Sequence, residues 1–349
     1  MDYLKGKGAQ INVPNRFLEH QITLEHVEGI DEELLLERPG TEIFYESPKK
    51  IISYNNSPDI GMSASINPYQ GCEHGCVYCY ARNSHEYWGF SAGLDFETKI
   101  IVKPDAPALL ERTFLQKNYK PKIIMLSGNT DCYQPLERKF KITREILDVC
   151  LKYKHPIGII TKNTLVTRDI DILSGLAKSN LVQVIFSITS EDEKLRRLME
   201  PRTASAKKKF KAISTLSQKG IPVGIMNAPI IPSLNHHEIP SIIKRSAEAG
   251  AAFAGYTVVR LNGQVEKVFH DWLLKNFPGR AEKVWKQIGE LHGGSVGDAQ
   301  FGRRISGGGK TTAMIKQLFE TSKRKYMKQS KPDPPDLTKF RKGGNYSLF

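Results

Sequence analysis

The chain has 349 residues, of which 40% are hydrophobic and 25% charged, as in globular proteins with one large domain or two modest ones. It has no apolar run of the roughly 18–20 residues that a membrane-spanning helix needs, and its start lacks the apolar core of a secretory signal. We therefore expect a cytoplasmic protein without a membrane segment. The formal net charge of +14 favours polyanionic partners such as DNA or RNA, although a solvated basic surface would give the same sum.

The first 60 residues form a polar, mixed stretch in which Pro14, Pro39 and Pro48 interrupt any long element. We interpret residues 1–60 as an N-terminal extension that wraps around the domain that follows. The texture of the sequence changes from Ser63 onward.

Short apolar, β-branched runs then alternate with stretches of helical spacing, which favours a parallel sheet covered by helices. Six such units predict an α/β core at 61–262, a partial (β/α)6 TIM-like barrel. A doubly wound open sheet has the same periodicity and stays an alternative. The expected strands are Ser65–Pro68, Lys122–Ser127, Ile157–Thr161, Val182–Ile188, Val223–Asn227 and Phe253–Val259, and the expected helices are Lys141–Lys152, Asp169–Ala177, Ala206–Lys219 and His237–Ala249.

The strand rhythm stops after Leu261. Residues 263–328 are predicted to be a mostly helical C-terminal extension, with helical stretches at 265–292 and 310–328. Residues 329–349 are rich in proline and basic residues and have little to bury, so we expect a flexible basic tail.

Three of the five cysteines lie within eight residues, directly after the first predicted strand. Cys72, Cys76 and Cys79 form a C-x3-C-x2-C pattern. Such close neighbours make a poor disulfide framework, and clustered thiols indicate metal or redox chemistry. A loop of this length can turn three thiolates toward an iron–sulfur cluster, leaving one iron of a four-iron cube open. A structural zinc site, with His74 or His85 as the fourth ligand, is the alternative.

The segment from Ile66 to Arg82 reads INPYQGCEHGCVYCYAR, with the aromatic Tyr78 just before the last cysteine. It resembles the radical S-adenosylmethionine (radical SAM) superfamily, in the branch of spore photoproduct lyase and DNA repair photolyase-like proteins. The resemblance extends over roughly Ser63–Asn262. It implies that the three cysteines hold a [4Fe–4S] cluster and that S-adenosyl-L-methionine binds its open iron. It also implies reductive cleavage to a 5′-deoxyadenosyl radical that takes a substrate hydrogen atom, with a one-electron donor such as flavodoxin or ferredoxin.

The resemblance further implies cofactor-binding roles for polar residues that follow the strands. Asn129 and Asp131 would accept from the cofactor ammonium, while Lys162 and Ser187 would bind its carboxylate or ribose. Each has an ordinary alternative, such as a polar turn or an exposed lysine. The implied cofactor-binding set is Tyr78, Asn129, Asp131, Lys162, Ser187, Glu200 and Arg202.

Within this set, Glu200 and Arg202 belong to a Met-Glu-Pro-Arg segment similar to a motif of this branch. Glu200 would accept from ribose hydroxyls and Arg202 would clamp a carboxylate, with a surface ion pair as the alternative. Cys132 follows Asp131 and is a candidate catalytic hydrogen-atom donor, although it does not match the family position. Cys150 lies on an apolar helical face and is expected to be a small core residue.

The function implied by this resemblance is hydrogen abstraction in a photolyase-like lyase reaction, DNA repair or another modification of nucleic acid. Radical SAM modification of a protein or small metabolite is a second hypothesis. A non-catalytic, metal-stabilised nucleic-acid-binding module is a third.

Overall fold

The computed structural model describes residues 3–17, 40–59, 61, 63–328 and 332–343. Its main sheet has seven strands in the order β10-β9-β8-β7-β6-β3-β2, all parallel to their neighbours except β2, which pairs antiparallel with β3. The strands are β2 (Ile52–Tyr54), β3 (Ala64–Ile66), β6 (Ile124–Leu126), β7 (Ile157–Thr161), β8 (Val182–Ser187), β9 (Val223–Ile230) and β10 (Phe253–Val258).

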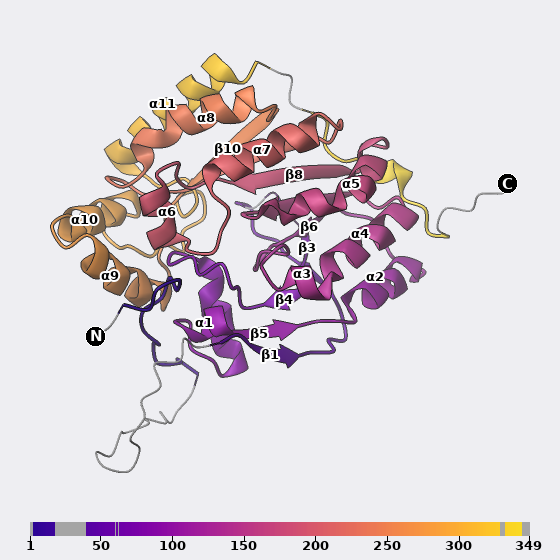
Figure 1. Ribbon diagram of the computed structural model, residues 1–349, viewed down its shortest axis with the longest axis horizontal. Coiled ribbons are helices and arrows are strands. Elements are labelled where there is room, and N and C mark those ends of the chain that lie inside the picture. Colours follow the sequence, from indigo (N-terminus) through magenta and orange to yellow (C-terminus); the bar gives the residue numbers. More distant parts are fainter. Residues whose placement is uncertain (1–2, 18–39, 60, 62, 329–331, 344–349) are drawn as a thin grey trace, which may run out of the picture.

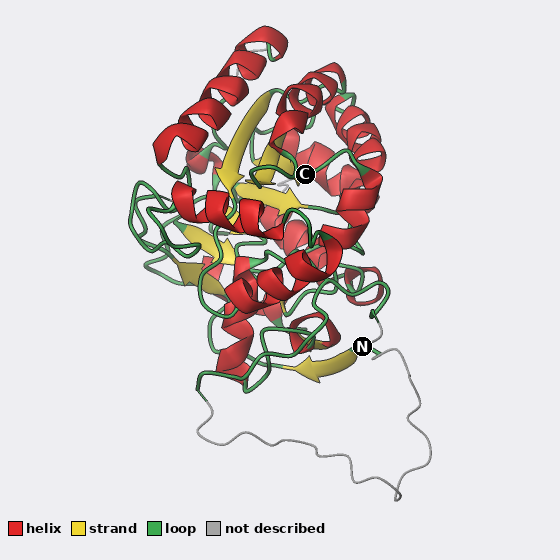
Figure 2. Ribbon diagram, turned by 90° about the vertical axis from the view of Figure 1, so that its left-hand side faces the viewer, coloured by secondary structure: helices red, strands yellow, loops and turns green. Residues whose placement is uncertain are grey.

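The parallel strands lie side by side in their order along the chain, from β3 to β10. A doubly wound sheet reverses its strand order at a switch point, and this sheet does not. The α/β prediction with a partial barrel of six parallel strands is therefore confirmed, and the doubly wound alternative is wrong. Figure 1 shows the strands inside an arc of helices, and Figure 2 shows the same layers from the side.

Residues paired across neighbouring strands share a face of the sheet. Ile66, Leu126, Ile159 and Val184 lie in one row and are buried in the main core against the helices. The adjacent row, which begins at Ser65, faces the concave side. The covering helices are α2 (Ala106–Leu115), α4 (Ile142–Lys152), α5 (Ile170–Ala177), α7 (Ala206–Ser217) and α8 (Ile239–Glu248), with shorter α3 (Glu137–Phe140) and α6 (Glu193–Met199).

A second sheet of three strands lies beside the start of the barrel, in the order β1-β5-β4. It joins part of the N-terminal extension to the segment that follows the cysteines. Its elements are β1 (Glu42–Tyr45), β4 (Tyr69–Gln70), β5 (Lys99–Val102) and the adjoining α1 (Asp95–Thr98). Residues 18–39 of the extension lie outside the described residues.

The C-terminal extension contains α9 (Val265–Asn276), α10 (Ala281–Leu291) and α11 (Gly309–Tyr326). The stretch expected to be helical at 265–292 is divided where Pro278 and Gly279 interrupt it. Phe269 and Trp272 of α9 pack in a second core with Cys76, Val77 and Tyr78. The C-terminal helices therefore cover the cysteine loop. Among the described residues, no helix is both long enough and apolar enough to span a bilayer.

The segment 332–343 belongs to the expected flexible tail, yet it lies against the amino ends of the strands. Asn180 Nδ2 donates to Pro334 O at 3.0 Å, and Gln183 Nε2 donates to Asp333 O at 2.9 Å. The ring of Phe340 packs against Phe114 at a centroid distance of 5.5 Å. The expectation that this tail has little to bury therefore does not hold for its described part, because Phe340 covers an aromatic cluster of the core.

Candidate active site

The three clustered cysteines lie on a turning loop at the carboxyl end of β3. Cys72 and Cys76 are buried, Cys79 is half-buried, and all three thiols are free. Gly71 and Gly75 take φ values of +79° and +68°, which side chains disfavour, and a Cβ at Gly71 would lie 2.9 Å from Lys99 O. The loop thus depends on glycine at both turns.

A buried ion pair between Arg82 and Glu97 holds the cysteine loop in place. The guanidinium of Arg82 donates to Cys76 O at 2.9 Å and to the Glu97 carboxylate at 2.5 Å. The same carboxylate accepts from the backbone N–H groups of Gly8 and Ala9, at 3.0 and 2.7 Å. The N-terminal segment around Gly8 and Ala9 is thereby tied to the cysteine loop. Sequence reasoning missed Arg82 and Glu97, because no local pattern links them.

The chemistry of the three thiols fits an iron–sulfur cluster. Burial raises the pKa of Cys72, Cys76 and Cys79, and the charges of Asp131, Cys76 and Cys79 raise that of Cys72 further. Backbone N–H groups of Ala81 and Arg82 act in the opposite direction on the pKa of Cys79. A bound metal removes these thiol protons outright, which relieves the cost of keeping adjacent thiolates buried.

The zinc alternative required His74 or His85 as a fourth ligand. His74 Nδ1 instead lies 3.3 Å from Asp131 Oδ2, and the His85 ring packs beside Phe90 and Phe96. Within the described ranges, no three His, Cys, Asp or Glu side chains converge on one metal ion. Cubane ligation differs, because each thiolate would bind a different iron atom.

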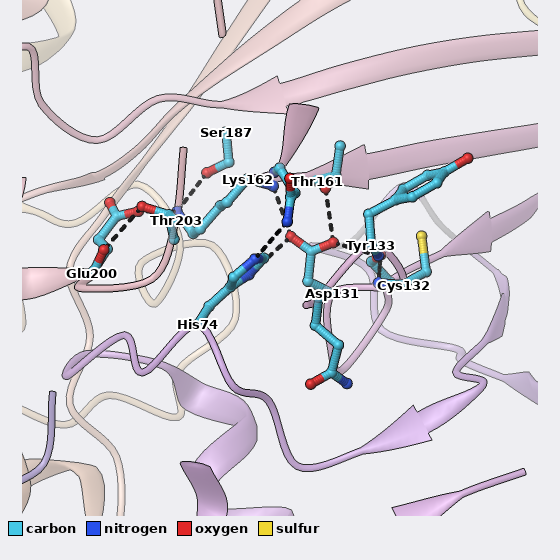
Figure 3. Close-up of polar contacts among 12 residues, drawn as sticks. His74, Asp131, Cys132, Tyr133, Thr161, Lys162, Ser187, Glu200 and Thr203 are labelled. Atoms are coloured by element: carbon cyan, nitrogen blue, oxygen red, sulfur yellow. Dashed lines mark hydrogen bonds and ion pairs between the residues drawn. The ribbon is translucent and has the colours of Figure 1, made fainter. Parts of the chain in front are cut away.

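Asp131 is held at the carboxyl end of the barrel by three hydrogen-bond donors and lies next to the His74 ring. Its carboxylate accepts from Tyr133 N at 2.9 Å, Thr161 Oγ1 at 2.8 Å and Lys162 N at 2.7 Å, and it faces His74 (Figure 3). Burial opposes ionisation of this carboxyl, but His74 and the hydrogen bonds outweigh burial, so the Asp131 pKa lies below its usual range. Asp131 therefore orients the backbone that presents Lys162.

The side chain of Lys162 reaches into a buried polar cluster beside the cysteine loop. Its ammonium donates to Ser187 Oγ at 2.8 Å and Thr189 Oγ1 at 3.2 Å, and lies 3.6 Å from Glu200 Oε2. It also lies 5.5 Å from the centroid of the Tyr78 ring, whose hydroxyl is 3.1 Å from Thr189 Oγ1. The structure thus brings Tyr78, Lys162, Ser187 and Glu200 together, with Thr189 added.

Glu200 is fully buried, and neither carboxylate oxygen receives a hydrogen bond within the described part of the chain. Burial opposes its charge, yet Lys162 and the buried Lys209 lower the Glu200 pKa to about 2. Lys209 enters from α7 and donates to Ser187 O at 2.9 Å. A charged carboxylate with free acceptor positions can receive hydroxyl or ammonium donors from a ligand.

The remaining predicted residues lie apart from this cluster. Asn129 Nδ2 donates to Ser84 Oγ at 2.9 Å, and Arg202 is exposed and lies 3.3 Å from Glu73 Oε1. Cys132 is fully buried in the main core, and its sulfur points away from the His74–Asp131 contact in Figure 3. This placement gives Cys132 packing neighbours and no contact with the Lys162 cluster, because the chain turns its side chain toward the helices.

Comparison with protein families decides the class. Residues 66–245, more than half of the chain, match the model of the radical SAM superfamily. The chain belongs to the radical SAM superfamily. Members of this superfamily use S-adenosylmethionine with a [4Fe–4S] cluster, so the family implies both for this chain. The prediction of the superfamily from the cysteine spacing is confirmed.

Two relatives of this radical SAM protein are uncharacterized proteins. One, from Methanocaldococcus jannaschii, is 32% identical over 243 residues, which cover 70% of this chain and 86% of the relative. Another, from Mycobacterium tuberculosis, is 29% identical over 225 residues, which cover 64% of this chain and 66% of the relative. The chain therefore spans just under two thirds of the length of the mycobacterial protein.

Among solved structures, the radical SAM protein is similar to spore photoproduct lyase complexed with dinucleoside spore photoproduct. The TM-score is 0.61 at 14% identity, and the alignment covers 87% of this chain and 86% of that one. A further structure of that lyase, with bound AdoMet and the same lesion, has a TM-score of 0.61. At this identity, the similarity shows a shared fold.

Proposed function

We propose that this protein is a radical SAM enzyme whose cluster is held by Cys72, Cys76 and Cys79. The observation that carries the proposal is the position of the cysteine loop, with Cys72 and Cys76 buried and Cys79 half-buried, beside the charged cluster of Lys162 and Glu200. When bound, the reduced cluster and S-adenosylmethionine supply a 5′-deoxyadenosyl radical that takes a hydrogen atom from the substrate.

The side chains of the site bind and orient the cofactor. Lys162 already lies among hydroxyl groups and offers its ammonium to the methionine carboxylate, assisted by Ser187. Glu200 accepts from the ribose hydroxyls, for which its free carboxylate oxygens are suited. Asp131 holds the backbone of Lys162, and the Lys162 ammonium lies over the Tyr78 ring.

Apolar packing covers one side of this site. Phe269, Trp272 and Leu273 of α9 are fully buried and pack in the same core as Val77 and Tyr78. A dry site protects a radical from side reactions and strengthens the charge contacts of Lys162 and Glu200.

We infer that the substrate is a nucleic acid, in a photolyase-like lyase reaction or another base or sugar modification. The net charge of +14 supports this, and so does the fold shared with a lyase solved with a dinucleoside lesion. A flavodoxin or ferredoxin would supply the electron. Fold similarity is an analogy, so modification of a protein or small metabolite stays the second candidate.

The test is anaerobic reconstitution with iron and sulfide, reduction, and an assay for 5′-deoxyadenosine after S-adenosylmethionine is added. Cys76→Ala should lose the brown chromophore and cofactor cleavage, because one cluster ligand is gone. Cys150→Ala is the matched control, since Cys150 is a buried thiol of the main core, and it should keep both signals.

Retention of the chromophore in Cys76→Ala would contradict the ligand assignment. Bound zinc without any 5′-deoxyadenosine in the wild-type protein would instead support a metal-stabilised binding module. If cleavage is present, accelerated turnover with damaged DNA or with RNA, but not with peptides or metabolites, would support the nucleic-acid substrate.

A further inference from the structure

A polar cavity of about 330 Å³ opens on the concave face of the barrel, at its β2–β3 end. Its volume lies in the roughly 300–1,000 Å³ range of ligand pockets. Gln70 and Asn129 line it, and Gln70 lies two residues before Cys72, so the cavity adjoins the cysteine loop. Its other polar lining residues are Lys50, Ser53, Ser65, Asn67 and Lys103.

The described lining of this cavity contains hydrogen-bond donors and two cations but no carboxylate. Lys50 is exposed and has no ion-pair partner among the described residues, while Lys103 Nζ lies 3.3 Å from Glu46 Oε2 outside the cavity. One net positive charge is therefore left for a ligand. The side-chain oxygen of Asn67 accepts from Asn129 N, which leaves its amide N–H groups free to donate. The complementary ligand is an oxyanion.

An exposed aromatic ring stands at the rim of the cavity. The hydroxyl of Tyr80 donates to the carbonyl oxygen of Gly128, which is itself a lining residue, and 54% of Tyr80 is exposed. Ser53 within the edge strand β2 and Lys50 just before it are also exposed, so a long ligand can enter and leave along this edge. A cationic pocket beside an exposed aromatic face suits a phosphate next to a base.

We propose that this cavity binds a phosphodiester of a single nucleic-acid strand, with an adjacent base stacked on Tyr80. The inference rests on the proposed function, whose substrate it specifies. Lys50 and Lys103 contact the phosphate, and the hydroxyls of Ser53 and Ser65 complete its hydrogen bonding. The bound strand then passes next to Asn129 and the cysteine loop.

The test measures binding of a fluorescein-labelled single-stranded 12-mer of thymidine by anisotropy, at several NaCl concentrations. Lys50→Gln should weaken binding roughly threefold to tenfold and reduce the slope of log Kd against log salt by about 0.7, the value for one phosphate contact in a single strand. Tyr80→Leu should weaken binding roughly tenfold with an unchanged slope, since stacking releases no counterions. The double variant Glu46→Gln/Lys103→Gln should weaken binding less than Lys50→Gln and leave the slope nearly unchanged, because it removes a pair with no net charge.

Lys219→Gln is the matched control, because Lys219 is exposed between α7 and β9 and should change neither affinity nor slope by comparison. Unfolding midpoints equal to the wild type establish that the variants are folded. Equal losses in Lys50→Gln and Lys219→Gln, or no binding of the 12-mer, would overturn the proposal. Equal competition by thymidine 5′-monophosphate or inorganic phosphate would assign the cavity to a small phosphorylated ligand and also overturn it.

These outcomes are separable from those of the proposed function. Cofactor cleavage by the wild type without binding of the 12-mer removes the phosphodiester site and leaves the enzyme class. Lys50-dependent binding without any cofactor cleavage supports the cavity and removes the enzymatic proposal.

Discussion

Lys209 is a buried cation that the folded chain holds beside the proposed cofactor site. It is 1% exposed, and its ammonium donates to Ser187 O. Burial lowers the pKa of Lys209 to about 8, although the charge of Glu200 raises it in part. An ordinary lysine has a pKa near 10.4, so this group loses its proton more easily in the folded than in the unfolded protein.

Lys209 therefore predicts a pH dependence of stability. Between about pH 8 and pH 10.5 the unfolded state binds more protons than the folded state, so the free energy of unfolding rises with pH from this group. The rise amounts to about 3 kcal/mol at most. Lys209→Met should abolish this component in denaturant titrations from pH 7 to pH 10, while Lys219→Met should keep it. Parallel pH profiles for wild type and Lys209→Met would contradict the prediction.

At the scale of single residues, the sequence predicts positions well for residues that lie at the carboxyl end of a strand. The cysteine spacing predicted the superfamily, and Lys162 and Ser187 come together because parallel strands end at one edge. Lys209 could not be predicted, since it closes a run of three lysines on an amphipathic helix, and packing alone turns it inward. The burial of Cys132 in the main core is likewise decided by tertiary packing, which the sequence around it does not show.

At the scale of elements, the N-terminal segment 3–17 is a strap across the cysteine loop. A Cβ built on Gly8 would overlap the carbonyl oxygen of Gly75, and one on Gly93 would overlap that of Ile11. Asn15 Nδ2 donates to Glu86 O at 2.8 Å and Gln264 Nε2 to Pro14 O at 2.8 Å. The strap thus joins the cysteine loop to α9. Its close approach to the chain requires glycine at positions 8 and 93.

Gly8→Ala should displace the strap, because its new methyl group has no space against the Gly75 backbone. We expect a loss of about 1–3 kcal/mol in the free energy of unfolding and less iron per chain after reconstitution. Gly40→Ala is the control, since no atom lies within 4 Å of a Cβ there. Equal iron content and equal unfolding midpoints in both variants would show that the strap does not support the loop.

The sequence predicted the helices and strands of the barrel better than the strands of the N-terminal extension. The six parallel strands and their helices carry continuous apolar runs, so the predicted ranges agree with the structure. The N-terminal extension, residues 1–60, contains the strands β1 and β2. The sequence did not predict these strands, because β1 is short and largely exposed. Its partner β5 pairs across 57 positions, as Glu42 with Lys99 shows, and such long-range pairing leaves no local pattern.

At the scale of the whole molecule, the segment 332–343 closes the amino end of the barrel. The Phe340 ring lies 5.6 Å from Tyr119 and 5.4 Å from His155 between ring centroids. Phe340→Ala should lower the free energy of unfolding by about 1–2 kcal/mol, because a half-buried aromatic ring is lost. Leu337→Ala, at an exposed position, should cost less than about 0.5 kcal/mol. Chemical denaturation measures both, and equal costs would contradict the packing role of Phe340.

The cover over the cysteine loop has a consequence for synthesis of the chain. Phe269 and Trp272 pack over the loop, and they leave the ribosome after the segment from Cys72 to Cys79. At roughly 5–20 residues per second, that delay is on the order of 10–40 s. During this interval the nascent thiols stand open to incoming iron and sulfide, as well as to oxidants. Cluster assembly on the nascent chain, before α9 is made, and cluster assembly in the finished protein, where α9 packs over the loop, are therefore two different steps.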